Sequence, residues 1–155
     1  GKRHLKLAID VALSGAFGID LALDNATAEE RAQLAEGVRL YKETIRPLVM
    51  HGELYRLVPP YEQPMASLSY VSTDKAQAIV YMYQTEDGSV PRVLLNGLDA
   101  SKQYVVNEIN LPKGGVSRFA AHGKTVSGSE LMKEGIQNVL KDQFDSAVIE
   151  LKAVN

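Results

Sequence analysis

The change from helical to strand periodicity falls within one stretch of the chain, residues 40–57, LYKETIRPLVMHGELYRL. Up to the middle of this stretch, apolar residues recur at spacings of four and three, which predicts one face of an amphipathic helix of about six turns. That stripe consists of Leu34, Val38, Tyr41, Ile45 and Leu48. After Gly52, short apolar runs alternate with turn residues, as in strands. We therefore predict a boundary between residues 1–52 and residues 53–155.

Residues 1–52 are predicted to form one βα unit. Apolar residues occupy every second position from Leu5 to Leu13, with alanines among them, which is typical of a buried parallel strand. A glycine-containing loop, residues 14–18, follows this strand. Thr27 and Glu30 have the spacing of a capping box and should begin the helix, and Pro47 should kink or end it.

Residues 53–155 are predicted to form an antiparallel β-sandwich, so the fold class is mainly β. Short runs rich in Val, Ile, Tyr and Leu recur about every ten positions, with turn residues between them. We expect strands near residues 53–58, 66–72, 77–84, 91–96, 103–109 and 144–153. Residues 127–133 could add one helical turn before the last strand.

Composition excludes several classes of partner and chemistry. Seventeen Lys and Arg against 19 Asp and Glu give a net charge of −2, without the basic excess that nucleic acid or an anionic membrane demands. With no cysteine and three scattered histidines, neither a thiolate zinc site nor a histidine cluster is expected. We predict no metal and no cofactor. Asp10 inside the first apolar run argues against a signal peptide, which slightly favours the cytoplasm, and the leading Gly1 favours a natural chain that extends upstream.

The residues that could carry chemistry mostly have a structural explanation. Glu29 and Glu30 lie in the first helical turn, where the helix dipole favours negative charge. Asp10 should have a structural partner, such as an arginine or a backbone amide, because an unpaired charge in an apolar strand is costly. Residues 15–18 do not match a phosphate-binding glycine motif. Apart from Tyr41, the tyrosines fall in or beside the predicted strands and are expected to pack in the core or between strands, and no tryptophan is available to stack on a sugar.

Three motifs, in the right order, resemble the α-galactosidases of glycoside hydrolase family 36. The stretch 40–57 resembles a Tyr-Lys helix that leads through Arg-Pro-Leu to Gly-x-Leu-Tyr-Arg-Leu. Residues 14–20, SGAFGID, are similar to the loop before that helix. Residues 95–99, LNGLD, followed by Tyr104, are similar to a Gly-Leu-Asp turn with its following tyrosine. The resemblance covers residues 5–110 best.

This resemblance implies a placement within a larger enzyme. Residues 1–52 would be the terminal βα unit of a (β/α)8 barrel, and residues 53–155 the C-terminal domain. The family hydrolyses terminal α-galactosides with retention, through two carboxylates. Its Lys-x-Asp and Ser-Asp motifs are both absent from this chain, so no catalytic residue is expected here. Only Gly15, Gly18 and Asp20 would reach the rim of the substrate site, because barrel active sites lie at the carboxyl ends of the strands.

Three functions remain open from the sequence. The chain could be the C-terminal part of an α-galactosidase, inactive alone, that meets its α-galactoside substrate through the missing catalytic barrel. It could instead be a carbohydrate-binding sandwich module, or a self-associating structural domain. Because a lone strand would leave both edges unpaired, we also expect a homodimer through Leu5–Leu13.

Overall fold

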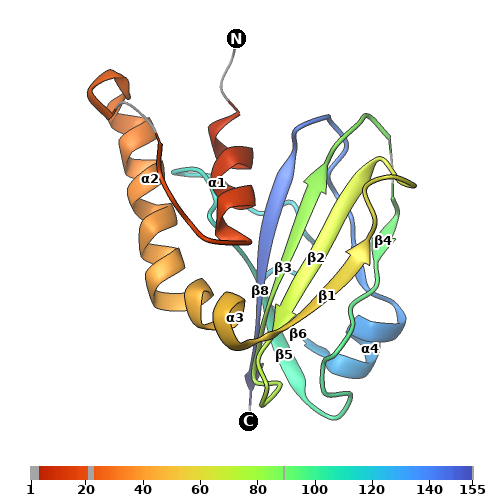
Figure 1. The fold of residues 1–155 in the computed structure, drawn as a ribbon. Helices are drawn as coiled ribbons and strands as arrows, with labels where there is room; N and C mark the ends of the chain where they lie inside the picture. Colours follow the sequence, from red (N-terminus) through yellow and green to blue (C-terminus); the bar gives the residue numbers. More distant parts are fainter. Residues whose placement is uncertain (1–3, 21–22, 89, 155) are drawn as a thin grey trace.

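The computed structural model describes residues 4–20, 23–88 and 90–154. Its centre is a six-stranded antiparallel sheet in the order β1-β2-β3-β8-β5-β6 (Figure 1). The strands are β1 (Glu53–Val58), β2 (Met65–Val71), β3 (Gln77–Gln84), β8 (Ser146–Val154), β5 (Gln103–Ile109) and β6 (Lys124–Ser127). The predicted mainly β, antiparallel fold is therefore confirmed. A second sheet holds only β4 (Arg92–Val93) and β7 (Ile136–Gln137), so the strand expected over residues 91–96 is much shorter than predicted.

Alternation along the two central strands sends side chains to opposite faces of the large sheet. One face carries Ala78, Val80 and Met82 of β3 beside Ala147, Ile149 and Leu151 of β8, and it packs under the small sheet and helix α4 (Gly128–Lys133). The other face carries Ile79, Tyr81, Tyr83 and Val148, and it packs against the N-terminal helices. Both faces are covered, which explains why β3 and β8 are buried along most of their length.

The strand predicted for residues 5–13 is wrong: these residues form helix α1 (Leu5–Leu13). The alternating apolar pattern conceals a second spacing, because Leu5, Ile9 and Leu13 lie four apart, as do Lys6 and Asp10. Ile9, Asp10 and Leu13 are the buried residues, which is one face of a helix. A helix satisfies its own backbone hydrogen bonds, whereas a strand needs a neighbour.

The long predicted helix is present in three consecutive parts, α2 (Ala28–Leu40), a π-helical turn η2 (Tyr41–Ile45) and α3 (Arg46–His51). Thr27 and Glu30 form the predicted capping box, with both reciprocal hydrogen bonds. Pro47 lies in the first turn of α3, and the wider π turn before it accommodates the bend. Gly37 lets α1 approach closely, since a Cβ there would lie 2.8 Å from the Ile9 side chain.

The short 3-10 turn η1 (Leu23–Asn25) precedes α2, and the predicted helical turn near residues 127–133 is present as α4. None of the described helices is both long and apolar enough to cross a membrane. Among the described residues, no three His, Asp or Glu side chains gather as metal ligands would.

Candidate functional site

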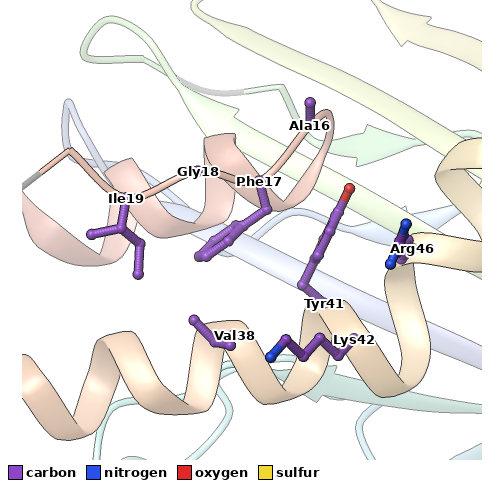
Figure 2. Close-up of a pocket in the computed structure, with 8 residues that line it drawn as sticks. All are labelled: Ala16, Phe17, Gly18, Ile19, Val38, Tyr41, Lys42 and Arg46. Atoms are coloured by element: carbon purple, nitrogen blue, oxygen red, sulfur yellow. The ribbon is translucent and has the colours of Figure 1, made fainter.

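A cavity of about 480 Å³ lies between the segment after α1 and the helix formed by α2, η2 and α3 (Figure 2). Phe17 and Ile19 point from the segment toward Val38 and Tyr41 on the helix. The rings of Phe17 and Tyr41 stack with their centroids 5.4 Å apart. The lining residues are Ala16, Phe17, Gly18, Ile19, Val38, Tyr41, Lys42 and Arg46.

The lining groups limit what this cavity can do chemically. Among the described residues, no carboxylate and no histidine lines it, so this lining lacks the pair of acids that glycoside hydrolysis needs. Its charged members are the cations Lys42 and Arg46, neither of which forms an ion pair with another described residue. The described lining can therefore accommodate apolar side chains and an anionic group, but it does not supply the carboxylate pair.

Three tyrosines from the sheet hold the C-terminal end of α1, from which the segment begins. Tyr83 donates to the Asp10 carbonyl at 3.0 Å, and Tyr81 donates to the Leu13 carbonyl at 2.9 Å. Tyr70 donates to the Ser14 carbonyl at 3.0 Å. Carbonyls at a helix C-terminus lack partners within the helix, so these phenols supply the missing donors. Burial raises the pKa of Tyr81 and Tyr83 well above the ordinary value, which keeps both phenols protonated as donors.

A buried polar cluster holds the other side of α1. The Asp10 side chain is fully buried and accepts hydrogen bonds from Lys6 Nζ at 2.5 Å, Asn110 Nδ2 at 2.6 Å and Ser146 Oγ at 2.7 Å. Lys6 also donates to the Ser146 carbonyl at 3.0 Å. The structural partner predicted for Asp10 is thus present, although it is a lysine, an amide and a hydroxyl rather than an arginine or a backbone amide.

The three rim residues predicted from the sequence lie at different places along the segment. Gly18 lines the 480 Å³ cavity. Asp20 lines a smaller adjoining hollow of about 150 Å³ between the segment, α1 and α2, and its side chain is exposed. Gly15 lies outside the lining of both hollows, where a Cβ would meet nothing within 4 Å. Sequence analysis did not predict Tyr41, Lys42 and Arg46 as cavity residues, although all three belong to the helical motif.

The turn at residues 95–99 packs against β1, so two of the three sequence motifs meet. Gly97 has φ of +76°, and a Cβ there would lie 2.2 Å from the Tyr55 ring. Only glycine fits this close approach with a left-handed backbone. Tyr55 donates in turn to Glu53, which Lys75 also contacts at 2.9 Å.

Tyr104 ties the same turn to the neighbouring hairpin. Its buried hydroxyl donates to the Lys75 carbonyl at 2.7 Å and accepts from the Asp99 amide at 3.1 Å. Gly128 lies against this turn, where a Cβ would come within 2.0 Å of the Asp99 carbonyl oxygen. The Gly-Leu-Asp motif and its following tyrosine therefore serve packing in this chain.

Comparison with known protein families shows to which family this chain belongs. The family described as "Glycosyl hydrolase family 36 C-terminal domain" matches residues 65–151, which is more than half of the chain and covers β2 through most of β8. The chain belongs to this family. The resemblance inferred from the three motifs is confirmed.

The chain spans about a fifth of the length of the alpha-galactosidases that it matches. It is 30% identical to "Probable alpha-galactosidase G" of Aspergillus terreus over 152 residues, which is 96% of this chain and 19% of that protein. It is also 30% identical to alpha-galactosidase AgaA of Geobacillus stearothermophilus over 154 residues, 97% of this chain and 19% of the relative. The chain is thus homologous to the C-terminal part of family 36 alpha-galactosidases.

Solved family 36 structures superpose on most of this chain. A variant of AgaA from Geobacillus stearothermophilus in complex with 1-deoxygalactonojirimycin superposes with a TM-score of 0.79 at 29% identity, over 94% of this chain and 19% of that one. A second AgaA variant, in complex with raffinose, superposes with a TM-score of 0.78 over the same shares.

Proposed function

We propose that this chain is the C-terminal accessory part of a retaining α-galactosidase, that it stabilises the catalytic barrel by packing against it, and that it is inactive alone. The boundary near residues 52 and 53 separates the barrel's last helical unit from the C-terminal sheet domain. Homology to the last fifth of alpha-galactosidases supports this proposal. So does the absence of both carboxylate motifs from the sequence.

The observation that carries the proposal is the unpaired backbone of the segment after α1. Residue 16 lies in a bend, residues 17–20 belong to no helix or strand, and no backbone–backbone hydrogen bond joins residues 16–20 to any other described residue. Phe17 and Ile19 point toward α2, so one face of the segment already packs on a helix (Figure 2). A segment with one covered face and free amides and carbonyls is an unfinished strand. We infer that residues 16–20, and not residues 5–13, are the barrel strand of this unit.

The direction of this strand refines the proposed rim of the substrate site. Active sites of such barrels lie at the carboxyl ends of the strands. Asp20 lies at that end of the segment and Gly15 lies at the opposite end, with Gly18 between them. Gly15 itself lies in the bend that precedes residues 17–20, outside the inferred strand. Asp20 is therefore the rim residue that this geometry favours, with α-galactosides as the substrate class.

The test is a chimera in which this chain replaces the matching C-terminal part of Geobacillus stearothermophilus AgaA. We expect the chimera to hydrolyse an aryl α-galactoside and the isolated 155-residue chain to give no turnover. Ile19→Lys should abolish activity and assembly, because it puts a charge between the strand and α2. Val116→Lys is the matched control, since Val116 is 85% exposed in a loop beyond β5.

Two results would contradict the proposal. One is turnover by the isolated chain that disappears when one of its own carboxylates is removed. The other is an Ile19→Lys chimera as active and as well assembled as the Val116→Lys control. The rim is tested separately: Asp20→Asn should raise KM in the chimera, whereas Gly15→Ala should leave KM unchanged.

A further inference from the structure

A third hollow, of about 500 Å³, lies at the first turn of α1 and shares no lining residue with the Phe17–Tyr41 cavity. Its walls are the first turn of α1, the segment that follows β5 and the turn that leads into β8. Phe144 forms part of this last wall and is 43% exposed. Its ring packs on His4 with the centroids 4.5 Å apart. An aromatic surface thus remains accessible at the edge of the hollow.

The backbone holds Phe144 in this position against its local preference. Its φ is +73°, in the left-handed region that bulky side chains rarely occupy. Hydrogen bonds on either side maintain the conformation: the Phe144 amide donates to the Gln84 carbonyl at 2.9 Å, and the Gln84 amide donates to the Asp145 carbonyl at 2.8 Å. Gln143 adds a bond from its amide to Asp87 at 3.0 Å. A strained backbone of this kind persists where the surrounding structure holds it in place. It points to a function for the side chain at that position.

Charged residues of both signs line the same hollow as Phe144. Arg118 pairs with Asp145 at 3.1 Å and remains half exposed, and the side chain of Glu108 also lines the hollow. Lys6 lines it too, but its ammonium is already bound to Asp10. Arg118 and Asp145 neutralise each other and Glu108 adds a second carboxylate, so the free rim offers both donors and acceptors, and a strongly anionic ligand would meet its own sign. Neutral hydroxyl groups can donate and accept at once, so they match such a rim.

We propose that this hollow is a binding site for a neutral saccharide. One sugar ring lies with its apolar C–H face on Phe144, and its hydroxyl groups bond to the Arg118–Asp145 pair and to Glu108. The site binds without hydrolysis, and none of its lining residues belongs to residues 16–20, which we infer to be the barrel strand. The proposal does not depend on the proposed function, because every group it uses belongs to this chain and lies outside the Phe17–Tyr41 cavity.

The test uses the purified 155-residue chain, with raffinose and methyl α-galactoside as probes and amide chemical shifts as the readout. We expect saturable shifts at residues 4–7, 108, 116–118 and 144–146, and none at residues 16–19 or 38–46. Phe144→Gly is the decisive variant, because glycine accepts the left-handed backbone while the ring is lost. It should bind about tenfold more weakly, as expected for removal of the main apolar contact, and unfold no more easily than the parent chain.

Lys75→Gly provides the matched control, since Lys75 also has a left-handed φ, of 58°, but lies in the β2–β3 turn. It should leave saccharide binding unchanged. The proposal is overturned if neither saccharide shifts the named amides at high millimolar concentration. It is also overturned if the shifts cluster at the Phe17–Tyr41 cavity, or if Phe144→Gly binds as well as the Lys75→Gly control.

Discussion

Asp10 provides the most direct test of how α1 is held on the sheet. Its carboxylate is the shared acceptor for donors from three places: Lys6 in the same helix, Asn110 after β5 and Ser146 at the start of β8. Replacing Asp10 with alanine removes that acceptor and leaves the donors in place. We expect α1 to lose its attachment to the sheet while the sheet itself remains folded.

The expected loss in the free energy of unfolding depends on which of the three donors can reach water. Asn110 and Ser146 are only 4% and 6% exposed, so each would become a buried donor without a partner, at about 1–3 kcal/mol. Lys6 has 24% of its side chain exposed and can turn its ammonium to solvent, so its loss adds little. Asp10→Ala should therefore lower the free energy of unfolding by about 3–4 kcal/mol, a large part of the ~5–15 kcal/mol typical of a domain. Asp10→Asn keeps one acceptor oxygen and should cost roughly half as much.

Urea denaturation followed by circular dichroism measures the free energy of unfolding, and hydrogen exchange shows where the change lies. Amides of α1 should lose protection in Asp10→Ala while those of β3 and β8 keep theirs. Asp142→Ala is the control, because Asp142 is exposed and forms no ion pair with a described residue. A loss below about 1 kcal/mol for Asp10→Ala, within the range of ordinary surface substitutions, would refute the reasoning.

Three further predictions concern other parts of the fold. Tyr81→Phe removes the donor to the last carbonyl of α1 and should lower the free energy of unfolding by about 1–2 kcal/mol in urea; an unchanged value would show that the phenol is dispensable. Gly97→Ala should cost about 2–3 kcal/mol through its left-handed backbone and the clash with the tyrosine ring of β1, while Gly15→Ala, which meets nothing, should cost little in the same thermal melts. Hydrogen bonds, from Tyr55 to Glu53 and from Ser72 to Asp74, are the main reason that the pKa values of both carboxyls lie below their ordinary values of 4.5 and 3.8. Stability from these groups is therefore present above the unfolded-state pKa and is lost as pH falls, so unfolding should become easier from about pH 5 down to pH 3, and a flat profile there would contradict the assignment.

The strands and the long helix were predictable because their signals are local. The Thr27–Glu30 capping box specifies where α2 begins whatever packs on it, since both partners lie within one turn. Alternation in residues 77–84 and 144–153 predicted the central strands correctly, because each must bury side chains on opposite faces. The sequence also contained the spacing of Lys6 and Asp10 that marks α1 as a helix. The stronger alternation of Leu, Ile and Val masked it.

The dimer expected through Leu5–Leu13 loses its physical basis because residues 5–13 form a helix. It required unpaired strand edges, and α1 bonds its own backbone internally. The tyrosines illustrate a second limit of sequence reasoning. Tyr70 and Tyr81 were expected to pack between strands, but their hydroxyls bond to carbonyls 56 and 68 positions earlier in the chain. No local pattern encodes a contact between residues so far apart.

The amino-acid sequence by itself determined the antiparallel β class, the start of α2, the family resemblance and the absence of the Lys-x-Asp and Ser-Asp motifs. All of these depend on residue types and short spacings. Only the tertiary structure decided that residues 5–13 are helical, that residues 16–20 are a segment with free backbone groups, and that Phe144 stands beside His4 at the edge of a hollow. Those features arise where elements distant in sequence meet, because the free energy of a buried polar group or an unpaired strand depends on what the rest of the chain brings against it.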